Sequence, residues 1–463
     1  MTLDRRSLLA AGVGASLSAS MGDGIAAHAG STRSGTSGPR GVRLAAATDG
    51  PVPRLAPGGS SDQTAVLQSL VDRAAATGEP VLLPPGTFRL TTLALRSGTR
   101  LAGAGAATVL LATEGTPLVV ADGAHDIAIE RLVLDGAHLP SAGGEPMGLL
   151  TLDGCRNFSL AAVEIRNSGG HGLLARRGSG AITGCRIAFA LDAGIHALDT
   201  TGMRIAMNEV TDCGNNGIQV WQGRTAEDGA IIHANHVARI RADGGGSGQN
   251  GNGINVYRAA GVSVSANRIT DCAYSAIRGN AASNLRITGN TCERLGEVAL
   301  YTEFGFEGAL IADNLVDGAA TGISITNFND GGRLAVVQGN LIRNLVRREH
   351  EPVDKRGEGI VVEADATVTG NTIEGAPTAG IVVGWGRYMR DCVVSANLVR
   401  SSRTGILLSA DPEAGAAFVT GNMISGARDG AIRAHRLGQP FGPDLALAAT
   451  DTQRVRISGN MAV

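Results

Sequence analysis

The sequence predicts an all-β protein that folds as a single-stranded parallel β-helix of about twelve coils, closed at its amino-terminal end by one helix. Three features predict this fold. An asparagine recurs at a nearly constant interval, a glycine followed by alternating aliphatic residues recurs between the asparagines, and glycine makes up 67 of the 463 residues. This glycine content is about twice the ordinary one. It follows no period of three, which excludes collagen.

The first repeated element is a β-rich run that ends at Asn, with an aliphatic residue two positions later, as in Asn208-Glu209-Val210. The mean interval is about 27 residues, and a unit of this length buries its apolar face only by stacking on its neighbours. Asparagine suits a stacked corner because side-chain amides hydrogen-bond along a ladder at the strand spacing. The ladder positions are Asn208, Asn235, Asn267, Asn290, Asn314, Asn340, Asn371, Asn397, Asn422 and Asn460, with Cys185 in the same place in an earlier copy.

The second repeated element is Gly, aliphatic, any residue, aliphatic, which has the period of two expected of a strand. Glycine permits a tight bend before each strand. Leucine-rich repeats share the repeat length but need a Leu-x-x-Leu-x-Leu pattern, which is absent. The repeats therefore predict a parallel β-helix. The clearest copies begin at Gly217, Gly253, Gly322, Gly359 and Gly380.

The segment ahead of the repeats predicts a cap. Ser61-Asp62-Gln63-Thr64 opens a helix that stops at Gly78, and the strand Pro84-Pro85-Gly86-Thr87-Phe88 follows. This helix and strand resemble the amino-terminal cap of the pectate-lyase-like superfamily, and the resemblance covers roughly residues 60–463. It implies a right-handed solenoid. The whole chain also resembles a family of twin-arginine-exported repeat proteins. The superfamily includes lyases, hydrolases, epimerases, esterases and inert tailspike-like proteins, so the resemblance leaves the activity open.

Residues 1–29 predict a twin-arginine signal peptide. Arg5-Arg6 precedes a short apolar region, and Ala27-His28-Ala29 offers a small-residue cleavage site. We therefore expect the twin-arginine translocation machinery as an export partner and a bacterial periplasmic or secreted protein, cleaved near Ala29. No membrane anchor is expected in the mature form, because the apolar region is short. Residues 30–57 are rich in Gly, Pro, Ser and Arg and predict a flexible linker. Residues 58–463 form the expected β-helix domain, with its cap at 58–115.

The charge and the positions of the cysteines argue against a nucleic-acid-binding protein and against a disulfide-stabilised one. The 40 basic and 42 acidic residues leave a net charge of −2, so no nucleic-acid partner is expected. The hydrophobic content of 43% is enough to bury a core. The six cysteines sit inside the repeats, where equivalent positions two repeats apart are too distant to form a disulfide. We expect buried free thiols.

Three copies of the repeat carry an extended connection at the same corner. They lie between Arg131 and Gly148, between Asn235 and Gly253, and between Asn340 and Gly359. The last two are four coils apart, about 19 Å at the strand spacing. Such loops predict a groove for roughly three or four sugar units on one side of the solenoid. The alternative is that insertions at this corner are merely tolerated.

The groove floor follows from strand alternation, which points every second side chain outward. Polar and aromatic residues concentrate on the coils near the insertions, whereas Leu150 and Leu152, or Val382 and Gly384, stand at the outward positions of other coils. Aromatic rings stack on sugar faces while polar groups fix hydroxyls, so a polysaccharide partner is expected. The alternative is an ordinary solvated sheet face. The candidate substrate-binding residues are Gln219, Trp221, Asn255, Tyr257, Asn280 and Thr326.

The candidate catalytic residues on the same floor support two reactions. Glu303 and Glu363 lie two coils apart, about 10 Å, near the upper end for the carboxylate pair of an inverting glycosidase. Arg278 beside Tyr301 fits a β-elimination on a uronate instead, although an arginine base needs an unusual environment. Four residues of the third extended connection are further candidates to act over this floor: His350, Glu351, Asp354 and Lys355, the single lysine of the chain.

Two motifs are set aside, and no metal or other cofactor is expected. Gly170-His171-Gly172 resembles the motif of polygalacturonase-type hydrolases, but the preceding coil lacks the carboxylates that this family needs. The segment 243–250 lacks the carboxylates of a calcium site and does not lead into a helix that would bind phosphate, so a flexible loop is expected there. Calcium bridging a uronate is compatible with such folds, but no Asp cluster favours it.

Together these features predict an exported carbohydrate-active protein, a polysaccharide lyase or glycoside hydrolase acting on an acidic, uronate-containing polysaccharide. The alternative is a non-catalytic β-helix that binds glycan or scaffolds the cell envelope. An enzyme would show converging acidic and basic groups on the groove floor, whereas a binding protein would show aromatic and amide groups without them.

Overall fold

The computed structural model describes residues 55–141, 147–246, 248–348, 357–447, 450–451 and 454–463. Within it, Leu55–Val463 forms one compact unit. The predicted signal peptide, most of the predicted linker, and His350, Glu351, Asp354 and Lys355 lie outside the described residues.

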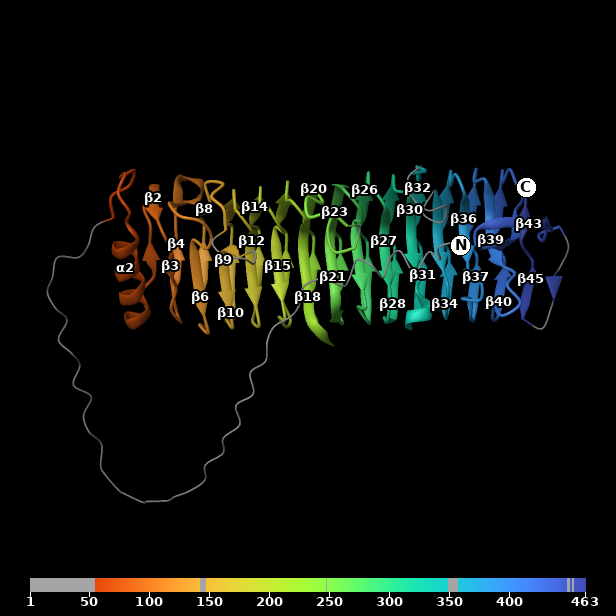
Figure 1. Cartoon of the computed structure of the whole chain (residues 1–463), viewed down its shortest axis with the longest axis horizontal. Coiled ribbons are helices and arrows are strands. Elements are labelled where there is room, and N and C mark those ends of the chain that lie inside the picture. Colours follow the sequence, from red (N-terminus) through yellow and green to blue (C-terminus); the bar gives the residue numbers. More distant parts are fainter. Residues whose placement is uncertain (1–54, 142–146, 247, 349–356, 448–449, 452–453) are drawn as a thin grey trace, which may run out of the picture. The chain divides into compact units, whose positions relative to one another are not determined.

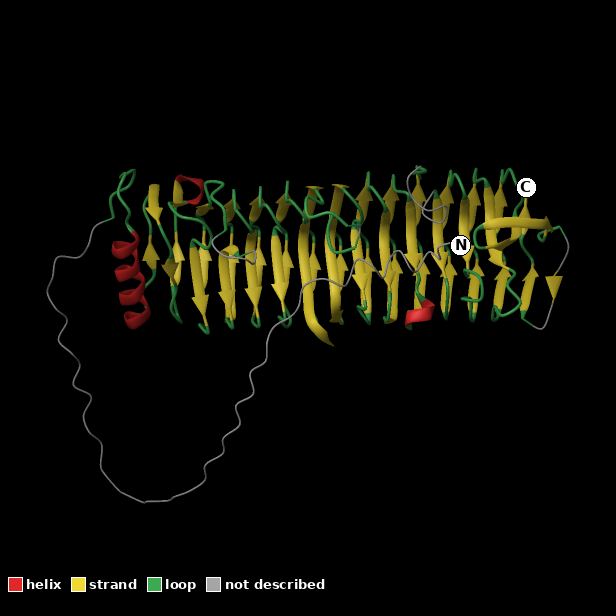
Figure 2. Cartoon of the chain, viewed as in Figure 1, coloured by secondary structure: helices red, strands yellow, loops and turns green. Residues whose placement is uncertain are grey.

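The described chain coils through three sheets, A, B and C, so that strands three apart in sequence pair in parallel (Figure 1, Figure 2). The sheets hold 16, 15 and 15 strands, slightly more than twelve coils would supply. This arrangement confirms the predicted parallel β-helix.

Sheet A contains, in spatial order, β1 (Val81–Leu82), β4 (Arg100–Ala102), β7 (Ala128–Glu130), β10 (Arg156–Ala161), β13 (Ser179–Thr183), β16 (Arg204–Ala206), β19 (Ile231–His233), β22 (Ser263–Ser265), β25 (Leu285–Thr288), β28 (Glu307–Ala312), β31 (Arg333–Gln338), β34 (Ala366–Thr369), β37 (Cys392–Ser395), β40 (Ala417–Thr420), β45 (Val455–Ser458) and β44 (Thr450–Asp451).

Sheet B contains β2 (Gly86–Leu90), β5 (Thr108–Ala112), β8 (Val133–Asp135), β11 (Glu164–Arg166), β14 (Arg186–Ala188), β17 (Glu209–Thr211), β20 (His236–Ile240), β23 (Arg268–Cys272), β26 (Thr291–Glu293), β29 (Leu315–Asp317), β32 (Leu341–Arg343), β35 (Thr372–Glu374), β38 (Leu398–Arg400), β41 (Met423–Ser425) and β46 (Met461–Ala462).

Sheet C contains β3 (Leu93–Ala94), β6 (Val119–Asp122), β9 (Gly148–Asp153), β12 (His171–Arg176), β15 (Ile195–Leu198), β18 (Asn216–Glu227), β21 (Asn252–Ala260), β24 (Ile277–Asn280), β27 (Val298–Glu303), β30 (Thr321–Ile325), β33 (Glu358–Val362), β36 (Ala379–Val383), β39 (Thr404–Ser409), β42 (Ile432–Arg436) and β43 (Gln439–Asp444).

The two ends of the solenoid are closed differently. At the amino-terminal end lies the predicted helix, α2 (Thr64–Thr77), which buries Leu67, Val71 and Ala74 and ends at Gly78 with a φ of 78°. At the other end β43 and β44 pair antiparallel with β42 and β45. Short 3₁₀ helices, η1 (Gly105–Ala107) and η2 (Phe328–Asp330), interrupt the connections.

The recurrent asparagines form the predicted ladder at the corner between sheets A and B. In a representative step, Asn290 Oδ1 accepts hydrogen bonds from the backbone N–H and Nδ2 of Asn267, each at 2.9 Å. Asn290 Nδ2 donates to Asn314 Oδ1 at 3.0 Å and to the Val264 carbonyl at 3.0 Å. Each amide therefore joins its own coil to the next.

The interior is a continuous apolar core, and it corrects one part of the alternation prediction. Leu150 pairs with Leu173, and both belong to the core together with Leu152. The outward residue of β9 is Thr151, so Leu150 and Leu152 point inward and not outward. The Gly148-Leu149 start suggests the opposite phase, but Gly148 lies in register with His171 and not with Gly172, so the Gly-aliphatic pattern is displaced by one residue in this strand.

The three extended connections all join a sheet B strand to a sheet C strand, as the spacing predicts. They run from β8 to β9, from β20 to β21 and from β32 to β33. The six cysteines are free and buried, which confirms the prediction of unpaired thiols. Burial raises the pKa of the Cys213 thiol to about 12, so this thiol stays protonated.

Candidate functional site

The outward side chains of sheet C form two parallel rows across neighbouring strands. In the first row, each residue is the register partner of the next one on the neighbouring strand. The row runs through Gln219 of β18, Asn255 of β21, Arg278 of β24 and Tyr301 of β27. In the second row the corresponding residues are Trp221, Tyr257, Asn280 and Glu303. The structure thus brings eight of the ten residues singled out in the sequence onto one stretch of sheet C.

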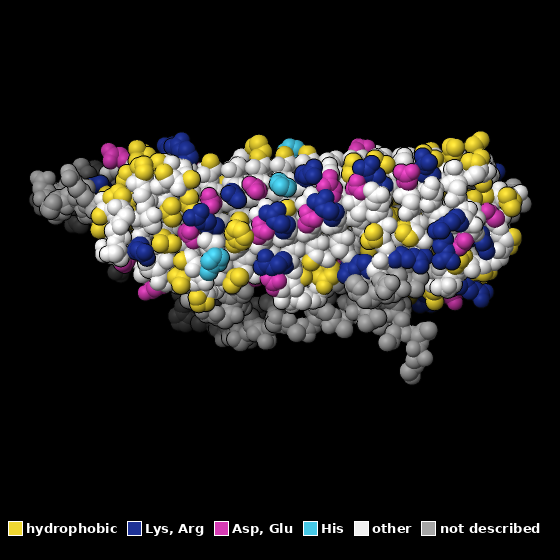
Figure 3. Space-filling model, turned by 90° about the horizontal axis from the view of Figure 1, so that it is seen from above, with side chains coloured by type: hydrophobic (Ala, Val, Ile, Leu, Met, Phe, Trp, Pro, Cys, Tyr) yellow, Lys and Arg dark blue, Asp and Glu magenta, His cyan; other side chains and the backbone are white. Residues whose placement is uncertain are grey.

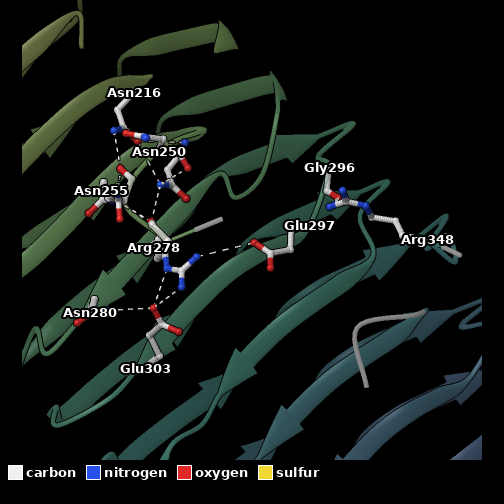
Figure 4. Close-up of polar contacts among 12 residues, drawn as sticks. Asn216, Asn250, Asn255, Arg278, Asn280, Gly296, Glu297, Glu303 and Arg348 are labelled. Carbon is white, nitrogen blue, oxygen red and sulfur yellow. Dashed lines mark hydrogen bonds and ion pairs between the residues drawn. The ribbon is translucent and has the colours of Figure 1, made fainter. Parts of the chain in front are cut away.

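A buried charged cluster occupies the centre of this stretch (Figure 4). The Arg278 guanidinium donates from Nε to Glu303 Oε1 at 2.7 Å, and its Nη2 lies 2.5 Å from the same oxygen. Its Nη1 lies 3.8 Å from Glu297 Oε2. The Tyr301 ring lies under the guanidinium, 4.8 Å from ring centroid to Cζ. Arg278 is 2% exposed, and Glu297 and Glu303 are 0% exposed.

Arg278 lies between two glutamate carboxylates, which bears on its predicted role in a β-elimination. Burial alone would lower the pKa of its guanidinium, but the carboxylates of Glu303 and Glu297 outweigh burial and raise it. Both carboxylates approach the one guanidinium. Arg278 can therefore neutralise a uronate carboxylate only by exchanging these partners.

One carboxylate oxygen of the buried Glu303 side chain has hydrogen-bond donors, and the other has none among the described residues. Its Oε1 accepts hydrogen bonds from Arg278 and from Asn280 Nδ2, the latter at 3.1 Å. Its Oε2 is buried and has no hydrogen-bond donor in the described part of the chain. A buried acceptor without a donor is costly, and a ligand hydroxyl would satisfy it.

Glu363 and Thr326 have a different environment. Glu363 Oε2 accepts a hydrogen bond from the backbone N–H of Phe328, at 2.8 Å, and so anchors η2. Thr326 lies 3.4 Å from Asn327 Oδ1, just before the same short helix. Both side chains are buried. The partner that the structure gives to Glu303 is Glu297, across Arg278, and not Glu363.

Glu297 escaped the sequence reasoning because it lies one residue before β27, outside the alternating pattern. The described part of the third extended connection reaches the same point. Arg348 Nη1 donates to the Gly296 carbonyl, and the Arg348 guanidinium lies 5.9 Å from the Tyr274 ring centroid (Figure 4). This connection, between β32 and β33, therefore borders the charged cluster.

The described part of the second extended connection, for which a flexible loop is predicted, borders the cluster on the other side and makes hydrogen bonds to neighbouring side-chain amides. Asn216 Nδ2 donates to the Gln249 carbonyl at 2.7 Å, and the Gly244 N–H donates to Asn215 Oδ1 at 2.7 Å. Asn255 Nδ2 approaches the Gln249 carbonyl at 3.4 Å (Figure 4). The side-chain amides of Asn215, Asn216 and Asn255 thus hold the described part of the loop.

Half-buried aromatic side chains continue the site toward the amino-terminal end. The Trp221 and Tyr257 rings meet edge to face, 5.7 Å apart at an interplanar angle of 66°. The Trp221 Nε1–H donates to Asn255 Oδ1 at 3.1 Å, which fixes the indole. Together with Asn280, these two residues are the partly exposed members of the stretch. They provide ring faces of the kind that sugars stack on.

Two buried histidines extend the aromatic series and were not chosen from the sequence. His196 packs on Trp221 at 5.2 Å, and His171 packs on His196 at 4.7 Å. Gly194-Ile195-His196-Ala197 fits the repeated pattern, so alternation could have placed His196 at an outward position. His171 belongs to the motif set aside above. Its nearest carboxylate, Asp192 on the following coil, lies 3.8 Å from Nε2.

A hollow of about 430 Å³ at the corner between sheets B and C does not belong to this stretch. Its lining includes Asp212 and Arg239, which pair with each other through two hydrogen bonds of 2.7 Å. Acidic and basic side chains also lie close together over much of the face seen in Figure 3. Charged groups that pair with each other in this way have few free hydrogen-bonding positions with which to bind a ligand.

Among the described residues, no group of three or more His, Cys, Asp or Glu side chains is arranged to hold a metal ion. Within the same residues, no helix has the length and apolar character needed to cross a membrane.

Comparisons with known proteins agree with the fold. The family model for a right-handed β-helix region matches residues 178–342 and 225–399. The catalytic domain of a GH87 α-1,3-glucanase in complex with nigerose is similar, with a TM-score of 0.54 and 14% identity over 80% of this chain and 70% of that chain. The amino-terminal fragment of bacteriophage Phi29 gene product 12 has a TM-score of 0.51 and 16% identity over 88% and 69% of the two chains.

A third similar structure is the A-module of the Azotobacter vinelandii mannuronan C-5 epimerase AlgE6, with a TM-score of 0.45 and 18% identity over 88% of this chain and 96% of that chain. A comparison with curated protein sequences finds no match. At these identities, the two structures with a TM-score above 0.5 show a shared fold and nothing more. The protein is a right-handed parallel β-helix.

Proposed function

We propose that this protein is an exported, carbohydrate-active β-helix protein that binds a polysaccharide on the outer face of sheet C and hydrolyses it. One observation carries the proposal. The partly exposed rings of Trp221 and Tyr257 lead, through Asn280, to the Glu303 carboxylate, whose Oε2 has no donor in the described part of the chain. Rings bind sugar faces, and the carboxylate accepts a hydroxyl or acts on the glycosidic bond.

The two carboxylates on one guanidinium support the proposal of hydrolysis. Glycoside hydrolysis needs one carboxyl group to protonate the leaving oxygen and a second to activate water or attack the anomeric carbon. Glu303 and Glu297 are the pair, and Arg278 holds both in position. Asn280 orients Glu303 through its amide.

The same contacts favour a neutral polysaccharide over the uronate-containing one expected from the sequence. A lyase needs a base and a cation that is free to neutralise the uronate carboxylate, and Arg278 is already committed to two glutamates.

A non-catalytic glycan-binding or cell-envelope scaffold is the second candidate. It is favoured by the burial of Glu297 and Glu303, both 0% exposed, because a catalytic carboxyl group must reach the substrate. In that case Trp221, Tyr257 and Asn280 would bind the glycan, and the buried charges would be structural.

Export through the twin-arginine machinery, to the periplasm or beyond, rests on Arg5-Arg6 and the following residues. Replacing both arginines by lysine is expected to leave the protein in the cytoplasm of a producing bacterium, as measured by fractionation. Unchanged export of that variant would overturn this part of the proposal.

The activity is tested with the purified protein and a panel of neutral glucans and uronate polysaccharides. We expect new reducing ends without the absorbance of unsaturated uronates. Activity should fall at least 100-fold in Glu303→Gln and persist in the matched Glu363→Gln variant. Absorbance from unsaturated uronates would establish a lyase instead. Binding without products would favour the scaffold, and neither binding nor products would reject the proposal.

A further inference from the structure

We propose that His196 and Gln219 form a second subsite on sheet C that recognises a hydroxyl group of a neutral glycan. This subsite lies apart from the Arg278 cluster. The inference rests on the proposed function, because it assumes that a polysaccharide lies on this face of the solenoid.

The hydrogen-bond chain assigns the proton on His196. The backbone N–H of Ala193 donates to His171 Nδ1 at 3.3 Å, so that nitrogen is an acceptor and the His171 proton sits on Nε2. His171 Nε2 then donates to His196 Nδ1, 3.2 Å away. His196 Nδ1 is therefore an acceptor too, and the His196 proton sits on Nε2.

This Nε2–H is a buried donor without an acceptor. His196 is 8% exposed, and its Nε2 has no hydrogen-bond partner in the described part of the chain. Gln219 is its register partner on the adjacent strand, β18. Gln219 is 3% exposed, and its Oε1 likewise has no partner among the described residues.

The neighbouring donor and acceptor indicate which ligand group would bind to both. Register partners on neighbouring strands are about 4.8 Å apart at the backbone. A hydroxyl both accepts and donates a hydrogen bond, so one hydroxyl, or two on adjacent carbons, would satisfy Nε2–H and Oε1 together. Buried polar groups normally have partners, and two such orphans in register mark a place where a ligand supplies them.

The surroundings favour a neutral sugar. The half-buried Trp221 ring packs against His196 at an interplanar angle of 75° and offers an apolar surface beside the two polar atoms. Burial lowers the pKa of both histidines, and His171 and Arg176 lower that of His196 further, so His196 is uncharged near neutral pH. His196 therefore supplies no positive charge to attract an acidic sugar, and the nearby Arg176 is paired with Asp153 at 2.9 Å.

The distance to the catalytic pair sets the length of the ligand. From β15, which carries His196, to β27, which carries Glu303, there are four strand spacings, about 19 Å. One glycan of roughly three or four sugar units, running along the solenoid axis, would reach both places.

The test uses isothermal titration calorimetry of the full-length protein with neutral glucan hexasaccharides, α-1,3-linked and β-1,4-linked. Gln219→Leu and His196→Phe keep the approximate shapes but remove the polar atoms. Each is expected to weaken binding roughly tenfold. Ser324→Ala, in the same row of sheet C but beyond Tyr301, is the matched control and should stay within twofold of the unmodified protein.

The outcomes separate the two proposals. If the unmodified protein binds and both variants bind equally well, the subsite is rejected and the proposed function stands. If the unmodified protein binds neither hexasaccharide nor any glycan of the wider panel, both are rejected. Circular dichroism checks folding, and if His196→Phe fails to fold, Gln219→Leu decides alone. Nitrogen NMR that places the His196 proton on Nδ1 would also overturn the assignment.

Discussion

The asparagine corner and the outer face of sheet C both bury polar side chains, but they differ in whether the hydrogen bonds of those side chains are satisfied. At the corner, Asn290 accepts from one neighbouring coil and donates to the other, and the same pattern repeats along the ladder. On sheet C, His196 Nε2, Gln219 Oε1 and Glu303 Oε2 have no partners among the described residues.

This difference distinguishes polar side chains that stabilise the fold from polar side chains that are placed to bind a ligand. A ladder of identical residues satisfies itself, because each coil presents the donor that the next coil needs. In a row of unlike residues, only some of the donors and acceptors find a partner within the row. Where the row changes from one residue type to another, as from His196 to Gln219, the unmet hydrogen bonds point to a ligand.

The largest effect is expected from Arg278→Met. The change leaves the Glu303 and Glu297 carboxylates buried without their cation and should lower the free energy of unfolding by about 3–5 kcal/mol. Denaturant unfolding followed by circular dichroism measures it. The double variant with Glu303→Gln should recover part of the loss. A loss below about 1 kcal/mol would mean that the cluster is not as buried as described.

A loss of about 3 kcal/mol is expected for Asn290→Ala, because the change strips partners from Asn267, Asn314 and the Val264 carbonyl. Asn280→Ala is the control from the other region. It removes one hydrogen bond at a half-exposed position and should cost about 1 kcal/mol or less. Equal losses in the two variants would contradict the contrast drawn between the regions.

Acid should weaken the carboxy-terminal end through His435. Burial lowers the pKa of this histidine to about 4, below its ordinary value of 6.5. The unfolded chain therefore takes up a proton before the folded one does. Stability is fully present above pH 6.5 and is lost as pH falls through that range to about 4, by up to about 3 kcal/mol.

Unfolding measured at a series of pH values checks this dependence. His435→Asn should flatten the profile between pH 6.5 and 4, although His171 and His196 keep part of the slope because burial lowers their pKa values as well. The exposed His138→Asn variant is the control and should leave the profile unchanged. An unchanged slope in His435→Asn would argue against a neutral, buried His435.

The smallest effect on folding, and a clear effect on binding, is expected from Trp221→Ala. Loss of the ring should weaken glycan binding about tenfold while lowering stability by about 1 kcal/mol or less, since the side chain is only half buried. Phe418→Ala removes an exposed ring from sheet A and should leave binding unchanged. Equal affinity of the two variants would place the glycan elsewhere.

The repeats made the fold predictable because stacking demands the same residue at the same corner in every coil. Ten asparagines and the recurrent Gly-aliphatic strands therefore determined the solenoid, its corners and the two outward rows from Gln219 to Glu303. Strand phase failed at Leu150 and Leu152, because Gly148 at the start of that strand lies in register with His171 and not with Gly172.

The chemistry of the site was less predictable, because it depends on contacts across coils. Alternation placed Arg278 beside Tyr301 and Glu303 but could not show that Glu297, at the edge of the strand, shares the guanidinium. It likewise could not show that the 241–251 loop is held by Asn215 and Asn216. Such contacts depend on side-chain reach and loop path, which residue spacing does not encode.

The most direct test of the central claim is a crystal structure of the protein with a neutral glucan oligosaccharide bound. The account predicts a sugar chain that runs along the solenoid axis over Trp221 and Tyr257, with a hydroxyl or the glycosidic oxygen within hydrogen-bond distance of Glu303 Oε2. A chain bound in the hollow beside Asp212 and Arg239, or on any face other than sheet C, would contradict it.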